Sequence, residues 1–194
     1  MLKIMINSVV CVCAVAGFIM GAVKFFRKKK PLYSQMVTVA LGCAALGRLY
    51  NISVMICGNG IPKTFNTGIL ATIGFAMFIF GANYGEMDSL CDMNFKRNRK
   101  MKWTALAVPA MLVITAAVIF VLSGGTTVYR ITCSLEIIFI AFAAYFNFKH
   151  FCIQDVEFGI IGSLRRYNLL ALMLELLYSA EITLDAFDRT KELP

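Results

Sequence analysis

The segment IMINSVVCVCAVAGFIMGAVKFFRKKK, residues 4–30, decides the fold class of this chain. Residues 4–23 contain no charged side chain, and a basic cluster follows directly, from Lys24 to Lys30. A run of about 18 or more uncharged residues is long enough to cross the hydrocarbon core of a bilayer as a helix. A cleavable signal peptide carries its positive charge before the apolar stretch. The order found here predicts a retained membrane helix whose C-terminal end lies inside the cell.

The rest of the chain repeats this pattern of apolar runs separated by short polar segments. We predict an all-α integral membrane protein with about six transmembrane helices, which form a single polytopic domain over residues 1–194. The predicted spans are residues 4–23, 33–57, 65–84, 103–122, 131–148 and 167–184. The last span is the least apolar, since Glu175 lies inside it and Glu181 near its end. A protein of five spans with a peripheral tail is therefore the topological alternative.

The stretch before the last predicted span has an amphipathic pattern. Ile153, Val156, Ile160 and Leu164 recur at helical spacing, opposite charged residues. Such a pattern predicts a short helix that lies along the inner membrane surface and does not cross the bilayer.

The composition agrees with a lipid environment and gives an orientation. Hydrophobic residues make up 59% of the chain and charged residues only 15%, whereas soluble domains carry about 25% charged residues. The net charge of +8 comes from basic residues in the segments between spans, so it indicates topology and no nucleic-acid partner. The basic residues concentrate in the segments after the first, third and fifth spans, which places both termini outside. We expect the plasma membrane, of a bacterium, as the location.

The seven cysteines give no evidence for a metal site or another cofactor. They are Cys11, Cys13, Cys43, Cys57, Cys91, Cys133 and Cys152, and none has the spacing of metal ligands. Cys57 and Cys133 both fall near the predicted outer boundary, so a disulfide between them is conceivable.

Two charged residues at membrane depth are the first candidates for a functional site. Arg48 lies roughly 22 Å of helix from the inner end of its span, and Glu136 roughly 8 Å from the outer end of its span. Both therefore reach the outer third of the bilayer, and we expect them to face one another in the bundle. The pair is either a structural ion pair or part of a ligand pocket that is open to the outside. Asn51 and Ser134 are expected as its polar neighbours.

Glu175 is predicted to lie nearer the centre of the bilayer, between Leu174 and Leu176. An ionisable residue at this depth is costly, and it normally faces the interior of the bundle. Glu175 could carry protons or bind an ion. It could equally be protonated against another helix, or mark a segment that does not span the membrane.

Pairs of small residues four positions apart predict close helix packing. Gly17 and Gly21 form one such pair in the first span, and Ala40 and Ala44 form another in the second. In size, helix count and the pair in the first span, the chain resembles the membrane-embedded substrate-binding subunits of vitamin-uptake transporters. The predicted outside termini depart from that family.

Three functions remain open at this stage. A transport or binding module for a small molecule or ion would place Arg48 and Glu175 in a wet cavity. A non-catalytic sensor or assembly subunit, which acts on a partner protein or a second copy, would have a packed interior and an exposed groove of small residues. A lipid enzyme would need polar residues that converge at one interface, such as Asn83, Glu86 and Asp88 near His150. No catalytic motif favours the enzyme, and the buried charges favour the first function.

Overall fold

The structure of the protein is a computed structural model, and its secondary structure consists of long helices. It describes residues 2–26, 32–57, 61–62, 64–91, 103–124, 126–152 and 159–187. These residues contain no strand. The helices of the described part are α1 (Leu2–Phe25), α2 (Leu32–Ile56), α3 (Thr67–Cys91), α5 (Ala107–Leu122), α6 (Thr127–Cys152) and α7 (Gly159–Ala186).

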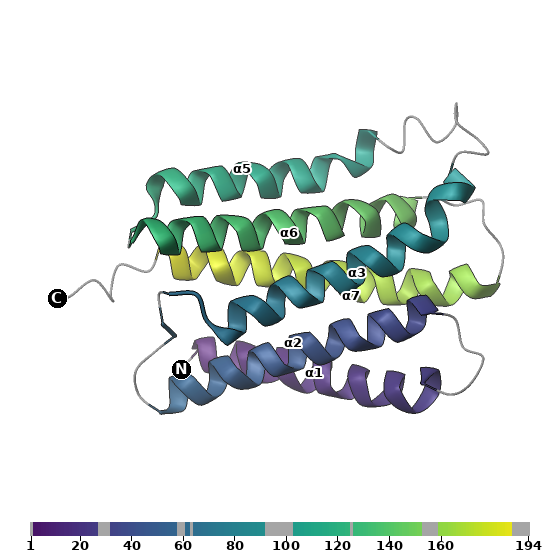
Figure 1. Ribbon diagram of the computed structural model, residues 1–194, viewed down its shortest axis with the longest axis horizontal. Helices are drawn as coiled ribbons and strands as arrows, with labels where there is room; N and C mark the ends of the chain where they lie inside the picture. The colour runs from purple at the N-terminus through teal and green to yellow at the C-terminus, as the bar shows by residue number, and fades with distance from the viewer. Residues whose placement is uncertain are drawn as a thin grey trace.

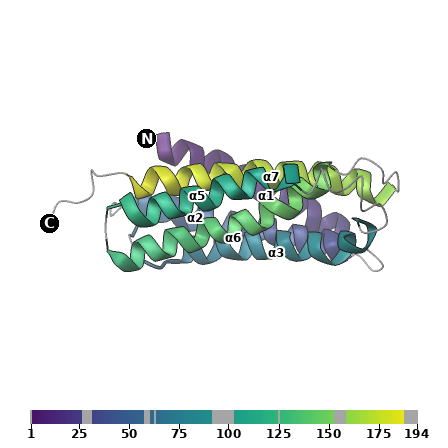
Figure 2. The ribbon, with the colours of Figure 1, turned by 90° about the horizontal axis from the view of Figure 1, so that it is seen from above.

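The helices lie side by side along one common direction, and consecutive helices run in opposite directions (Figure 1). α2 packs between α1 and α3, while α6 packs against α3, α5 and α7. Seen from above, α1 and α7 lie along one side of the bundle and α3 and α6 along the other (Figure 2). As a result, the start of α1 and the end of α7 lie at the same end of the bundle (Figure 1).

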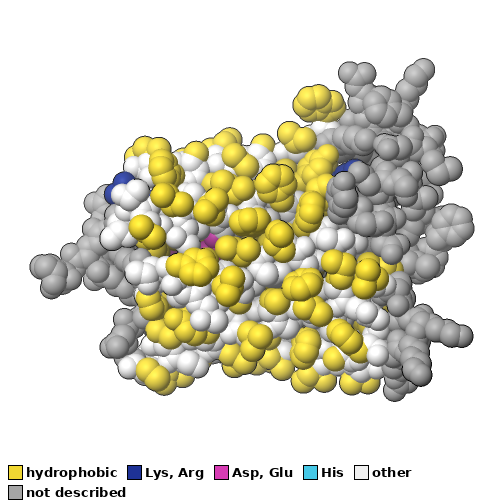
Figure 3. Space-filling model, in the orientation of Figure 1, with side chains coloured by type: hydrophobic (Ala, Val, Ile, Leu, Met, Phe, Trp, Pro, Cys, Tyr) yellow, Lys and Arg dark blue, Asp and Glu magenta, His cyan; other side chains and the backbone are white. Residues whose placement is uncertain are grey.

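The outer surface of the bundle is apolar, as expected for a protein whose solvent is lipid. Large hydrophobic side chains cover the face seen in Figure 3. Met111 is 70% exposed and Leu46 is 64% exposed, whereas Ile79 and Ile137 are fully buried in the core. A soluble monomer rarely exposes apolar patches of more than a few hundred Å². The all-α membrane bundle predicted from the sequence is therefore supported.

Four segments of the described chain are long and apolar enough to cross a bilayer, judged by length and composition. They are Asn7–Phe25, Leu32–Ile56, Trp103–Leu122 and Thr127–Lys149. In α3, whose side chains are described as far as Asn83, the apolar stretch Thr67–Asn83 is shorter than these four. α7 does not meet the same criterion, since acidic side chains interrupt its apolar run. The count of six spans is thus not established by these criteria.

One local prediction differs from the structure, whereas the fourth predicted span, residues 103–122, is found with one irregularity. Residues 159–166, the second half of the predicted interfacial helix, are continuous with α7, because no glycine or proline separates them from the apolar run that follows. Residues 153–158 lie outside the described part of the chain. In the fourth predicted span, the helix is interrupted at Leu106, and α5 begins at Ala107. Pro109 therefore lies in the first turn of α5, where its missing N–H leaves no helical hydrogen bond unmade.

The glycines of α1 let α2 approach closely, as the small-residue spacing predicted. A Cβ atom on Gly21 would lie 2.4 Å from the Thr38 Oγ1 atom, and one on Gly17 would lie 2.9 Å from Leu41 Cδ1. Ala40 and Ala44 of α2 are buried in the core. Small residues at these positions allow the helix backbones to pack tightly without any aqueous driving force between the helices.

Because this contact has no spare room, Gly21→Ala should lower the free energy of unfolding by about 1–3 kcal/mol, the usual cost of overpacking. Thr38→Ala should restore most of the loss, since it removes the two atoms closest to the added methyl group. Gly74→Ala is the matched control, because its Cβ would meet no atom closer than 3.4 Å. Thermal unfolding in detergent micelles measures Gly21→Ala, Gly74→Ala and the double variant that combines Gly21→Ala with Thr38→Ala. Equal stability of Gly21→Ala and Gly74→Ala would contradict the described packing.

Candidate functional site

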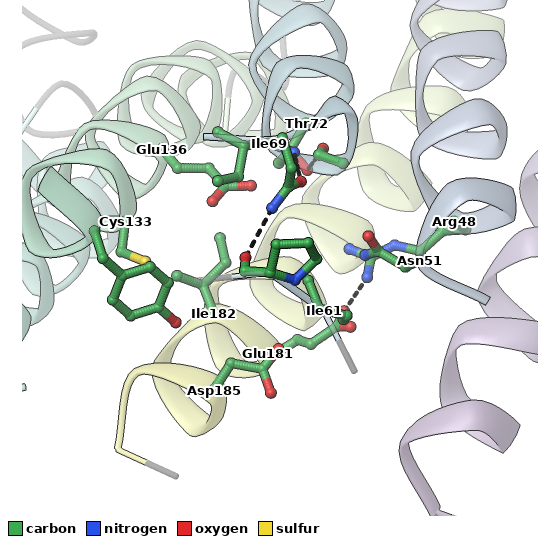
Figure 4. A pocket seen from close by; sticks show the side chains of 14 residues that line it. Arg48, Asn51, Ile61, Ile69, Thr72, Cys133, Glu136, Glu181, Ile182 and Asp185 are labelled. Atoms are coloured by element: carbon green, nitrogen blue, oxygen red, sulfur yellow. Dashed lines mark hydrogen bonds and ion pairs between the residues drawn. The ribbon is translucent and has the colours of Figure 1, made fainter. Parts of the chain in front are cut away.

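A cavity of about 70 Å³, with both charged and apolar side chains in its wall, opens at the end of the bundle where α6 begins and α7 ends. A cavity of roughly 10–15 Å³ is enough for one water molecule, so this one has room for several waters or a small ligand. Its walls come from α2, α3, α6, α7 and the segment before α3 (Figure 4). The residues that line it include Arg48, Asn51, Asn66, Thr72, Tyr129, Cys133, Glu136, Glu181 and Asp185.

One wall of the cavity holds a closed cluster of Arg48, Asn7 and Glu181. The Arg48 guanidinium forms an ion pair with the Glu181 carboxylate. Arg48 Nη1 also donates a hydrogen bond to Asn7 Oδ1 at 2.9 Å, and Asn7 Nδ2 donates to Glu181 Oε1 at 2.8 Å. The guanidinium carbon lies 3.9 Å from the centre of the Tyr178 ring. The charge of Arg48 is therefore balanced by contacts that join α1, α2 and α7.

Glu136 lies on the opposite side of the same cavity (Figure 4). It is only 5% exposed, and the Thr72 side chain lies within hydrogen-bonding reach of its carboxyl group. Arg48 and Glu136 thus face a common space, as expected from the sequence. The ion-pair partner of Arg48 is nevertheless Glu181, because α7 reaches across the bundle to α1 and α2 while Glu136 enters from α6.

The two polar neighbours expected for this pair separate in the structure. Asn51 lines the cavity, and its Oδ1 atom is buried without a hydrogen-bond partner. Ser134 lies outside the cavity, because its hydroxyl group turns toward α5 and donates to the Ala116 carbonyl oxygen at 3.0 Å. Cys133 lines the cavity as a free thiol, and Cys57 is likewise free, so no disulfide joins them.

Glu175 does not line this cavity and belongs to a second polar cluster. Its Oε1 atom accepts a hydrogen bond from Asn147 Nδ2, Asn147 Oδ1 accepts from Asn83 Nδ2, and Asn83 Oδ1 accepts from Asn168 Nδ2. Each of these three bonds is 2.8 Å long. The four side chains are at most 2% exposed. Glu175 Oε2 has no hydrogen-bond partner, which leaves one acceptor of the carboxyl group unmatched.

Tyr178 separates the cavity from this asparagine–glutamate chain. It lies one helical turn from both Glu175 and Glu181 on α7, and it is 1% exposed. Its ring forms an edge-to-face contact with Phe75 at 5.4 Å between centroids, and the Arg48 guanidinium lies over the Tyr178 ring. An aromatic layer therefore lies between the two polar regions of the bundle interior.

Sequence reasoning missed several members of both clusters. Asn7 and Asn147 lie in apolar runs, where a single amide has little effect on hydropathy, and Glu181 lies near the end of a predicted span. For α7, one pattern could have indicated a buried polar cluster. Asn168, Glu175 and Ser179 interrupt an otherwise apolar helix, and buried polar groups require hydrogen-bond partners. The polar cluster predicted for a lipid enzyme depends on the side chains of Glu86, Asp88 and His150, which lie outside the described part of the structure.

No family model, no curated protein and no solved structure matches this chain. Within the described residues, no group of three or more His, Cys, Asp or Glu side chains is arranged to hold a metal ion. The apolar helices are therefore consistent with a helical membrane protein, and the described residues surround a cavity lined by charged and apolar side chains.

Proposed function

We propose that this protein binds a small molecule or ion in the cavity between Arg48 and Glu136, as a transporter or as the binding subunit of one. The proposal rests on one observation. A cavity large enough for several water molecules, with charged side chains in its wall, lies inside a bundle whose outer surface is apolar. Charged residues at membrane depth are costly and commonly mark substrate or ion pathways. Arg48, Asn51 and Glu136 would contact the ligand from different helices.

Glu175 extends the proposal from binding to transport. Its carboxyl group lies deeper in the bundle than the cavity and carries an unmatched acceptor, so it could take up a proton or an ion during a transport cycle. Tyr178 would have to move for a ligand to pass from the cavity to Glu175. Six membrane passes, both termini outside and a bacterial plasma-membrane location complete this proposal, and the positive-inside distribution of Lys and Arg supports the orientation.

The alternative was a sensor or assembly subunit with an exposed groove of small residues. In the described residues, Gly17 and Gly21 pack against α2, and only a narrow hollow of about 10 Å³ remains beside them. The binding proposal is therefore the better supported of the two.

Native mass spectrometry of protein gently extracted from its own membrane tests this proposal. We expect a bound species of defined mass on the wild-type protein, and its loss in Arg48→Ala and Glu136→Ala. Ser134→Ala is the matched control, because Ser134 lies on the same helix as Glu136 but bonds to α5. A protein partner in stoichiometric amount, with no small ligand on the wild-type protein, would overturn the proposal in favour of the subunit alternative.

A further inference from the structure

A second hollow, of about 200 Å³, lies between α5 and α6 and shares no lining residue with the cavity around Arg48. Side chains from both helices form its wall, and they include Leu106, Pro109 and Val113 on one side and Ile138, Ala141 and Tyr145 on the other. Each set has the spacing i, i+3, i+7, which follows one face of a helix along its axis. The hollow therefore runs lengthwise between the two helices, which lie side by side (Figure 1).

The hollow opens onto the outer surface of the bundle. Ala141 is only 2% exposed and lies at the bottom, whereas Val113 is 50% exposed and Phe142, which also lines the hollow, is 58% exposed. The neighbouring side chain of Met111 belongs to the apolar surface described above. Whatever fills the hollow thus comes from the surroundings of the bundle.

The lining of the hollow selects a hydrocarbon. Only apolar atoms of the lining residues face it, and a buried water molecule needs two to four polar partners. An empty hollow would leave its wall without dispersion contacts on one side. An apolar cavity of about 150 Å³ stays dry and admits a molecule the size of benzene, so the hollow has room for several methylene groups.

The position of the hollow along α5 corresponds to the acyl chains of one leaflet. Trp103 is 69% exposed at the start of this span and follows Lys100 and Lys102 in the sequence, an order typical of an inner membrane interface. Leu106 and Val113 lie roughly 5 and 15 Å of helix beyond Trp103. One leaflet contributes roughly 15 Å to the hydrocarbon core, which is half of its thickness. The hollow therefore spans the depth at which acyl chains lie.

We propose that this hollow is a binding site for one acyl chain of a phospholipid from the leaflet that contains Trp103. The chain lies parallel to α5 and α6, with its methylene groups against Pro109 and Ala141 and its headgroup at the level of Trp103. A helix of a partner protein, about 10–12 Å across with its side chains, would cover such a hollow without filling it. This site is separate from the cavity of the proposed function and does not depend on it.

Quenching of Trp103 fluorescence by a phosphatidylcholine with brominated acyl chains tests the proposal. Trp103 is the single tryptophan of the chain and lies three residues before Leu106, so its emission reports a bromine atom close to the hollow. The full-length protein in detergent micelles is titrated with this lipid at ratios too low to coat the bundle. We expect saturable quenching, which a phosphatidylcholine with unbrominated chains reverses by competition.

Ala141→Phe should weaken this binding at least roughly tenfold, because the added ring fills the hollow and the loss of about two buried methylene groups already gives that factor. Val113→Phe, at a half-exposed position, blocks the same hollow without a change in the core. Ala117→Phe is the matched control, since Ala117 is exposed on α5 but does not line the hollow.

Equal affinity of Ala117→Phe and both blocking variants would overturn the proposal. Quenching that rises in proportion to the lipid without saturation would also overturn it, since this is the behaviour of ordinary boundary lipid. A wild-type dimer that Val113→Phe dissociates, without saturable quenching, would replace the acyl chain by a second copy of the protein.

Discussion

Glu181→Ala should destabilise the protein by about 3–5 kcal/mol, the largest effect expected of any single substitution at the cavity. The cause is the buried guanidinium of Arg48, which is 5% exposed and would lose its counter-charge. Asn7 would remain as a hydrogen-bond partner but cannot balance the charge. Arg48→Ala should be less harmful than Glu181→Ala, because Glu181 is more exposed than Arg48 and can be solvated through the cavity. Denaturant titration in micelles measures both variants.

A double-mutant cycle identifies the true partner of Arg48. The double variant Arg48→Met with Glu181→Met should recover most of the lost stability, since replacing both charges by apolar groups of similar volume is often close to neutral. The cycle between Arg48→Met and Glu136→Gln should show a much smaller coupling energy. A large coupling for Glu136 and none for Glu181 would contradict the cluster described here and restore the direct Arg48–Glu136 pair.

Asn147→Leu should give the second large loss of stability, because Asn147 occupies the middle of the asparagine–glutamate chain. Its removal leaves Glu175 Oε1 without a donor and Asn83 Nδ2 without one of its two acceptors. Each buried polar group left unsatisfied costs about 1–3 kcal/mol. Asn168→Leu should cost less, since it deprives only Asn83 Oδ1 of its partner.

Glu175→Gln is the matched control for this chain, because a glutamine keeps a carbonyl oxygen that can accept from Asn147 Nδ2. We expect it to cost less than Asn147→Leu, since only the new amide N–H group, placed where Glu175 Oε2 has no partner, is left unsatisfied; the same denaturant titration measures it. Equal losses for Asn147→Leu and Asn168→Leu would contradict the order of hydrogen bonds. A collapse of Glu175→Gln would mean that the carboxyl group has an essential contact other than the one to Asn147.

The class of fold could be predicted because the relevant information is local. An uncharged run such as residues 4–23 has few stable states other than a helix in lipid, and the structure has α1 over Leu2–Phe25. The boundaries at polar loops were less accurate. α7 begins at Gly159, earlier than the predicted residue 167, because surface amphipathicity and continuation of a helix give similar sequence patterns.

The candidate site could be predicted only in part, since its partners come from helices far apart in the chain. The depth of Arg48 and Glu136 follows from helix length, and this was enough to place both on one cavity. Which carboxylate pairs with Arg48 depends on the rotation and neighbours of α7, and no periodicity in the sequence specifies them. For the same reason, the contacts of Asn83 with Asn147 and Asn168 could not be predicted. Asn147 is 64 residues and Asn168 is 85 residues from Asn83 along the chain.

The proposed function requires that the space between Arg48 and Glu136 is a water-accessible cavity inside a membrane-embedded bundle. Cys133 lines this cavity, whereas Cys11 is equally buried in α1 with its thiol directed at the Ala45 carbonyl oxygen. Two variants that each retain one of these thiols should therefore differ in the exchange of the S–H hydrogen for deuterium, followed by infrared spectroscopy of membranes placed in D₂O. We expect the Cys133 thiol to exchange faster than the Cys11 thiol, because a buried hydrogen exchanges only where water reaches it. Equal exchange rates for the two thiols, or no exchange at Cys133, would contradict a water-accessible cavity.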